Sequence, residues 1–123
     1  MILWITGNSG AGKTTLAEKI LPPLGIHLDG DDIRERITGF DLSGTGRREH
    51  NLNTAKWAKL LSDQGFDVVV SMICPFEDLR EEVKQITGCK FLYLEYEGDD
   101  KIPDKPYEKP VNPEYRIQSY KGE

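Results

Sequence analysis

Residues 7–14, with the sequence GNSGAGKT, constrain the fold of this chain more than any other feature. They match the pattern G-x-x-x-x-G-K-[ST], in which glycines let the backbone curl around a phosphate group and direct several N–H groups at it. An apolar run at 2–6 precedes the loop, and apolar residues at helical spacing follow Lys13. A strand before this motif and a helix after it are the context that the motif requires. The sequence therefore predicts that the chain binds the phosphates of a nucleoside triphosphate.

The residues of this loop have separate expected roles. With ATP and Mg²⁺ as the predicted cofactors, Lys13 should contact the β- and γ-phosphates, and the hydroxyl of Thr14 should ligate the metal. Thr15 should help to hold the α-phosphate, and the helix that begins at Lys13 adds the positive end of its dipole. The alternative is a strand-turn-helix unit in which the glycines only allow a tight turn. That alternative would not explain the Lys-Thr pair at the start of the helix. The predicted ATP-binding residues are Gly7, Asn8, Ser9, Gly10, Ala11, Gly12, Lys13, Thr14 and Thr15.

Apolar segments downstream alternate between strand-like and helix-like patterns. Residues 66–73 form a nearly continuous apolar run, which is typical of a central parallel strand buried on both faces. Asp29 or Asp31 should cap a brief helix that is followed by a loop at 39–46. We expect further strands at 2–6, 26–28, 90–96 and 116–120, and further helices from 13 to the prolines at 22 and 23, from 47 to 64, and from Pro75 to Gly88. This alternation predicts a three-layer α/β fold, with a parallel sheet of about four or five strands and helices on both faces.

Size and composition narrow the class of protein. A chain of 123 residues is expected to form one domain, 1–123. Its net charge of −5 argues against nucleic acid or an anionic membrane as the main partner, and its apolar runs are shorter than the ~20 residues of a membrane span. The N-terminal apolar run lacks a basic region before it, so we expect a strand there and not a signal peptide. Cys74 and Cys89 lack metal-ligand spacing and are expected to be reduced thiols in a cytoplasmic protein.

Four further segments carry a resemblance to a known family. They are LDGDDIRERI at 28–37, GRREHN at 46–51, VVVSMICPFEDLR at 68–80 and KPYEKPVNPE at 105–114. In this order they are similar to DGDNIR, DRxEN, SxISPYxxxR and PYEAPxNPE of the adenylylsulfate kinase family. Enzymes of this family transfer the γ-phosphate of ATP to the 3′-hydroxyl of adenylylsulfate. The resemblance implies an ATP-dependent phosphotransferase with the P-loop NTPase and nucleotide-kinase fold.

The resemblance also implies which acids act in catalysis. Asp31 would orient or deprotonate the acceptor hydroxyl and assist Thr14 in binding Mg²⁺, and Asp29 would support it. Both acids follow the end of a predicted strand, where ligands of open α/β sheets collect. Each also has a structural alternative, because a helix N-cap needs one of the two. The predicted catalytic residues are Lys13, Asp31 and Asp29.

A second group of residues would bind the acceptor, a small anionic molecule of nucleotide type. Arg34 and Arg47 would pair with its phosphate or sulfate, and their alternative is solvated surface charge. An ungapped alignment sets Arg47 and His50 opposite the family's Arg and Asn, whereas a shift by one residue sets Arg48 and Asn51 there, and both registers stay open. Phe40 (or Leu42) and Phe76 would sandwich a base, unless they belong to the core. The predicted acceptor-binding residues are Arg34, Phe40, Arg47, His50, Asn51, Ile73, Cys74, Pro75 and Phe76.

Two departures from the family pattern bear on function. Cys74 stands where the family has the serine of ISPY, and we expect it to be a buried small apolar residue. The seven residues GDDKIPD at 98–104 replace the family's long basic lid, which supplies cations and excludes water. The resemblance implies adenylylsulfate as the acceptor, and the loss of the lid leaves a related nucleotide as an equal alternative. The alternative is an ATP-binding regulatory module without efficient transfer. A homodimer is compatible with the sequence.

Overall fold

A parallel sheet forms the middle layer of the computed structural model, which describes residues 1–8, 10–39, 43–96 and 107–119. Its five strands lie in the order β2-β3-β1-β4-β5, and each neighbouring pair is parallel. The prediction of a parallel sheet with about four or five strands is confirmed. The strands are β1 (Ile2–Thr6), β2 (Ile26–Asp29), β3 (Val68–Ser71), β4 (Lys90–Glu95) and β5 (Tyr115–Gln118).

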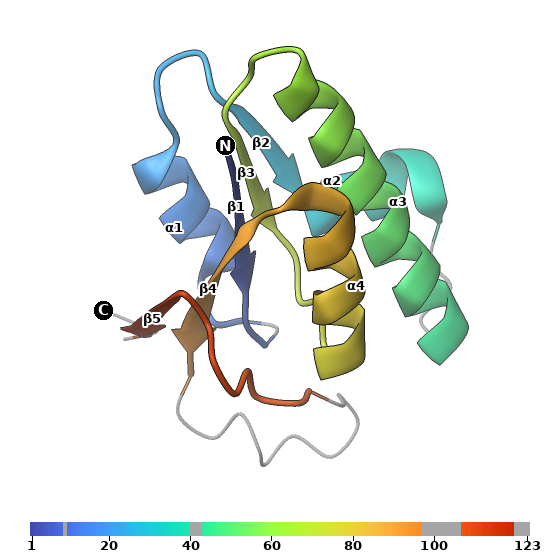
Figure 1. Cartoon of the computed structure of the whole chain (residues 1–123). Helices are drawn as coiled ribbons and strands as arrows, with labels where there is room; N and C mark the ends of the chain where they lie inside the picture. Colours follow the sequence, from blue (N-terminus) through green and yellow to red (C-terminus); the bar gives the residue numbers. More distant parts are fainter. Residues whose placement is uncertain (9, 40–42, 97–106, 120–123) are drawn as a thin grey trace.

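Helices cover both faces of this sheet (Figure 1). Helix α1 (Lys13–Ile20) packs on one face, and α3 (Gly44–Asp63) and α4 (Glu77–Thr87) pack together on the other. Between β2 and α3, the short α2 (Gly30–Ile33) continues into the π-helical turn η1 (Arg34–Thr38). The predicted three-layer α/β fold is confirmed. Within the described residues, no helix combines the length and the apolar character that crossing a membrane requires.

Strand side chains alternate between two cores, one on each face of the sheet. Trp4 and Val70 are fully buried in the core beneath α3 and α4, which also contains Ala55 and Leu79. Ile5, the next residue along β1, is fully buried in the core beneath α1. The period of two follows from the pleat of the strands. The buried character on both faces explains why the sequence of β3 shows no alternation of polar and apolar residues.

Several predicted boundaries were wrong by a few residues. Helix α3 begins at Gly44 within the predicted loop, because the Ser43 hydroxyl accepts a hydrogen bond from the Gly46 N–H at 3.1 Å and caps the helix there. Strand β3 occupies only the middle of the predicted segment 66–73, and β5 begins one residue before the predicted strand at 116–120. The prediction of an Asp29 cap is confirmed, since its carboxylate accepts from the Asp32 N–H at 3.4 Å.

The start of α4 was also predicted incorrectly. Pro75 does not lie in its first turn, because Cys74 has a positive φ of 45° and the chain stays extended through Phe76. The first helical N–H, that of Glu77, donates to the side chain of Glu108 at 3.0 Å. A carboxylate from a distant part of the chain therefore caps α4, which no local sequence pattern indicates.

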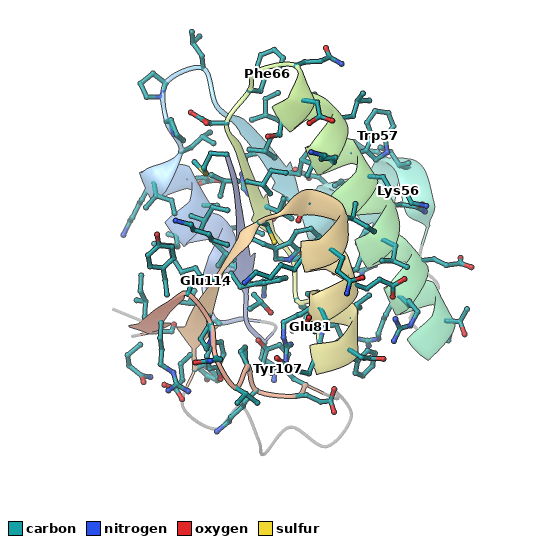
Figure 2. All side chains as sticks on the ribbon, viewed as in Figure 1. Lys56, Trp57, Phe66, Glu81, Tyr107 and Glu114 are labelled. Carbon is teal, nitrogen blue, oxygen red and sulfur yellow. The ribbon has the colours of Figure 1, made fainter. Side chains whose placement is uncertain are left out.

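Arg80 attaches this C-terminal segment to the rest of the protein. Its side chain is almost fully buried and donates to the Cys74 carbonyl at 2.7 Å, to the Glu77 carboxylate at 2.6 Å, and to the Glu108 carbonyl. Its guanidinium lies 5.5 Å from the centre of the Tyr107 ring, and Figure 2 shows Tyr107 beside the first turn of α4. The segment that begins at Tyr107 is therefore held against α4 and the loop before it.

We expect Arg80→Met to destabilise the fold and to loosen this segment. Removing the guanidinium takes a donor from the Glu108 carbonyl and leaves the buried Cys74 carbonyl with the longer 3.5 Å hydrogen bond from Thr6, which should cost roughly 1–3 kcal/mol of the free energy of unfolding. The matched control is Arg48→Met, because Arg48 pairs with Asp78 at 2.8 Å from a partly exposed position. That change should cost less than about 1 kcal/mol. Urea unfolding measures both, and equal losses would contradict the role of Arg80.

Candidate active site

A cavity of about 700 Å³ opens at the carboxyl ends of the strands. The loop before α1, the start of α2 and one side of α3 line it, so it lies where ligands of parallel α/β sheets bind. Predicted site residues from distant parts of the sequence meet here. Those that line the cavity are Gly10, Ala11, Gly12, Lys13, Thr14, Thr15, Asp29, Asp31, Arg34, Arg47, His50, Asn51, Ile73 and Pro75.

The loop between β1 and α1 has the geometry of a phosphate-binding loop. Gly10 and Gly12 have φ values of 83° and 97°, a left-handed conformation that favours glycine. A Cβ on Gly7 would lie 2.7 Å from the Leu94 carbonyl oxygen, so only glycine fits there without a shift of the backbone. No described side chain caps the N-terminus of α1, and the Lys13 ammonium donates to the Asn8 carbonyl at 2.9 Å. This arrangement fits a chain of phosphates.

The carboxylate of Asp29 is the centre of a hydrogen-bond network at the edge of this loop. Thr14 Oγ1 donates to Asp29 Oδ1 at 2.7 Å, and Ser71 Oγ donates to the same oxygen at 2.8 Å. Burial favours a raised pKa, but the hydrogen bonds from Thr14 and Ser71 outweigh it and hold the pKa of Asp29 below its ordinary value. Asp29 is therefore ionised at neutral pH. It is both the cap of α2 and the acid that meets the predicted metal ligand Thr14.

Asp31 lies in the same cavity but has different surroundings. Its side chain is 93% exposed, and its carboxylate lies 3.4 Å from the guanidinium of Arg34. The structure brings Asp29, and not Asp31, into hydrogen-bond contact with Thr14. The described residues contain no group of three or more His, Cys, Asp or Glu side chains that could hold a metal ion. Thr14 and Asp29, with oxygens of bound phosphates, would form a donor set that suits Mg²⁺, and the expected assistance of Asp31 stays a prediction.

One side of α3 forms the opposite wall. Arg47, His50 and Asn51 line the cavity, whereas Arg48 faces α4 and pairs with Asp78 and Glu82. Arg47 and His50 belong to the first of the two open alignments, and Asn51 belongs to the second. Residues from both alignments therefore line the cavity.

His50 and Asn51 are both almost fully buried at this wall, and both have polar contacts. His50 Nε2 lies 3.1 Å from the Gly30 carbonyl, which connects α3 to the turn that carries Asp29 and Asp31. Asn51 Nδ2 donates to the Arg47 carbonyl at 2.8 Å, while its Oδ1 has no hydrogen-bond partner among the described residues. A buried oxygen without a donor favours a bound group that supplies one.

The remaining predicted residues do not line the cavity or lie outside the described part of the chain. Cys74 is fully buried and burial raises the pKa of its thiol, so it has the expected character of a small core residue. Phe76 packs against the core beneath α3 and α4. Gly7 lies close to the Leu94 carbonyl, and the Asn8 carbonyl accepts a hydrogen bond from Lys13. Ser9, Phe40 and Leu42 lie outside the described residues.

Among the polar residues that line the cavity, sequence reasoning missed Lys19 on α1 and three others, Ser71, Gln118 and Ser119. Ser71 had a signal, because it is the polar residue that interrupts the apolar run of the predicted strand segment 66–73. Gln118 and Ser119 come from the end of β5, where Ser119 Oγ donates to the Ala11 carbonyl at 2.5 Å. Only the pairing of β5 with β4 brings them to the phosphate loop, and no local pattern indicates it.

The burial of His50 predicts a pH dependence of stability. Burial, and then the nearby Arg34 guanidinium, lower the pKa of His50 from 6.5 to about 4. Between these pH values the unfolded chain binds a proton at His50 that the folded protein does not bind. The free energy of unfolding should therefore be highest above pH 6.5 and should fall as the pH is lowered, by at most ~1.4 kcal/mol per pH unit from this residue.

The control for this prediction is His50→Gln, which keeps an N–H donor for the Gly30 carbonyl but does not titrate. Urea unfolding of both proteins between pH 4.5 and pH 7.5 measures the difference. The variant should lose this part of the pH dependence. Parallel curves for the two proteins would contradict the assignment.

The comparisons with known proteins agree with this geometry. The family model described as adenylylsulphate kinase matches residues 1–97. A cytidine diphosphoramidate kinase of Campylobacter jejuni is 36% identical, over 76% of this chain and 59% of its own length. An adenylyl-sulfate kinase of Burkholderia ambifaria is 38% identical, over 68% of this chain and 50% of its own. The chain thus spans about half to three fifths of these two relatives.

A solved structure matches nearly the whole chain. The adenylylsulfate (APS) kinase CysC of Mycobacterium tuberculosis, in complex with AMPPNP and APS, has a TM-score of 0.79 and 25% sequence identity. The match covers 97% of this chain and 88% of that one. With the family model, the sequence relatives and the fold in agreement, the chain belongs to the adenylylsulfate kinase family.

Proposed function

We propose that this protein is an ATP-dependent kinase that transfers the γ-phosphate to a hydroxyl of a small anionic nucleotide. The observation that carries the proposal is one cavity lined both by the phosphate loop and Asp29 and by Arg34, Arg47 and Asn51. A kinase needs a site for the triphosphate beside cations for the acceptor, and this cavity has the residues for both. Membership of a family of ATP-using kinases supports the same reaction.

At the phosphate end, the residues of the loop bind and orient ATP. The backbone between Gly10 and Thr14 would surround the phosphates, and the Lys13 ammonium, which donates to the Asn8 carbonyl, would contact the β- and γ-phosphates. Thr14 and Asp29 would hold Mg²⁺ together with phosphate oxygens. The bound metal supplies charge that neutralises the phosphate oxygens during transfer.

Asp31 is the candidate general base. It lines the same cavity as Asp29, its carboxylate is exposed, and the Arg34 guanidinium lies close enough to orient it. In this role Asp31 accepts the proton of the acceptor hydroxyl while the hydroxyl oxygen attacks the γ-phosphate. Arg34 and Arg47 bind the anionic groups of the acceptor, and the unpartnered Asn51 Oδ1 accepts a hydrogen bond from it.

Adenylylsulfate is the first candidate acceptor, because the family model and the Burkholderia relative are adenylylsulfate kinases. Cytidine diphosphoramidate is the second, since the Campylobacter relative is named for it and matches a larger part of this chain. Both are small nucleotides, as predicted for the acceptor. A regulatory module that binds ATP without transfer is not favoured, because these relatives are named kinases.

We propose a cytoplasmic setting as well, since Cys74 and Cys89 are both free and buried. The single domain 1–123 and the homodimer stay predictions of the sequence.

The test is ADP release from Mg-ATP with no acceptor, with adenylylsulfate, and with cytidine diphosphoramidate. Lys13→Ala should lower the stimulated rate by at least ~100-fold, because Lys13 stabilises the charge of the transferring group. The control is Lys59→Ala, since Lys59 pairs with Asp63 on the exposed side of α3. Stimulation by one acceptor identifies the reaction. A full rate in Lys13→Ala would mean that the phosphate loop is not the active site.

The two acids should respond differently to loss of charge. Asp29→Asn should raise the Mg²⁺ concentration needed for half-maximal rate, because it removes a carboxylate from the metal site. Asp31→Asn should lower kcat by ~10²–10⁴-fold with the Mg²⁺ requirement and the ATP affinity nearly unchanged, because it removes the base. Initial rates at varied Mg²⁺ and ATP measure both. The same pattern in the two variants would contradict the division of roles.

A further inference from the structure

We propose that His27, on β2, is a positioning residue for the candidate metal site. It acts through Ser71, and together the two side chains orient the Asp29 carboxylate that meets Thr14. The inference rests on the proposed function, because it concerns the Mg²⁺ that accompanies ATP at that site.

Three hydrogen bonds connect the four side chains in series. His27 Nε2 lies 2.6 Å from Ser71 Oγ, which lies 2.8 Å from Asp29 Oδ1, and this oxygen lies 2.7 Å from Thr14 Oγ1. The sheet makes this series possible, because Asp29 pairs directly with Ser71 in the parallel register of β2 and β3. His27 precedes Asp29 by two residues, so both side chains lie on the same face of the sheet. This face is the one that α1, with Thr14, covers.

The number of available protons determines the direction of each hydrogen bond. An ionised carboxylate only accepts, so the single proton of the Ser71 hydroxyl is donated to Asp29. Ser71 Oγ is then the acceptor in its contact with His27, and His27 Nε2 is the donor. If Nε2 were an acceptor instead, the Ser71 proton would turn toward the ring. Asp29 would then lose one of the two donors on Oδ1. The donor at Nε2 therefore sets the orientation of Ser71.

The orientation of Asp29 matters because Mg²⁺ requires strict ligand geometry. Apart from Ser71, Asp29 accepts from the Thr14 hydroxyl and, at the longer distance of 3.4 Å, from the Asp32 N–H. Thr14 is itself a predicted ligand, so Ser71 is the partner that can hold the carboxylate in place while Thr14 turns to the metal. Residues that orient a ligand in this way typically change metal affinity by about 10–100-fold.

The test compares two amides of different reach at position 27. The amide nitrogen of glutamine reaches the place of His27 Nε2, whereas that of asparagine ends one bond earlier. The measurement is calorimetric titration of Mg²⁺ into the full chain with ADP bound. His27→Asn should weaken Mg²⁺ binding by about 10–100-fold, and His27→Gln should stay close to the wild type. The affinity for ADP without metal should be the same in all three proteins.

A double-mutant cycle tests the path through Ser71. Ser71→Ala should weaken Mg²⁺ binding by itself, and His27→Asn should add little in the Ser71→Ala background if both act in series. Ser71→Ala also carries the test if His27→Asn lowers the thermal stability. Additive losses, or equal losses in His27→Gln and His27→Asn, would overturn the inference while leaving the proposed function intact. A wild-type protein without Mg²⁺-dependent nucleotide binding would overturn both.

Discussion

The carboxylate of Asp29 joins four elements from three parts of the sequence. It ends β2, caps α2, and accepts hydrogen bonds from Thr14 at the start of α1 and from Ser71 at the end of β3. A partly buried carboxylate is costly unless donors surround it, and the hydrogen bonds from Thr14 and Ser71 offset the cost of burying Asp29 and hold the ends of these elements together. These hydrogen bonds also give the phosphate loop a fixed negative group beside Thr14, the predicted metal ligand.

The opposite charge lies across the cavity and comes from other elements. Although the chain has a net charge of −5, Arg34 follows α2 and Arg47 lies in the first turns of α3, and both line the cavity. Arg48 and Arg80 have structural roles instead, since each pairs with acids on α4. The cavity is thus a local exception to the acidic surface. Arg47 and Arg48 are adjacent in sequence but lie on different sides of α3, so the first lines the cavity and the second pairs with α4.

Most of the fold could be predicted because its signals are local. The glycines at 10 and 12 need a left-handed backbone, and the run of valines in β3 needs burial on both faces, and both features are visible in the sequence. The errors arose where a distant group decides the outcome. Helix α4 begins at Glu77 because Glu108 caps it, although the local sequence placed Pro75 in its first turn.

The sequence by itself determined the phosphate loop, the order of strands and helices, and the family. These follow from short-range patterns, namely backbone freedom at glycines and the periods of apolar residues. Only the tertiary structure decided which acid meets Thr14, which arginine enters the cavity, and that His27, Ser71 and Asp29 form one series. The physical reason is that these contacts depend on strand register and on helix rotation. Both are set when the whole core packs, and a shift of one residue turns each side chain to the other face.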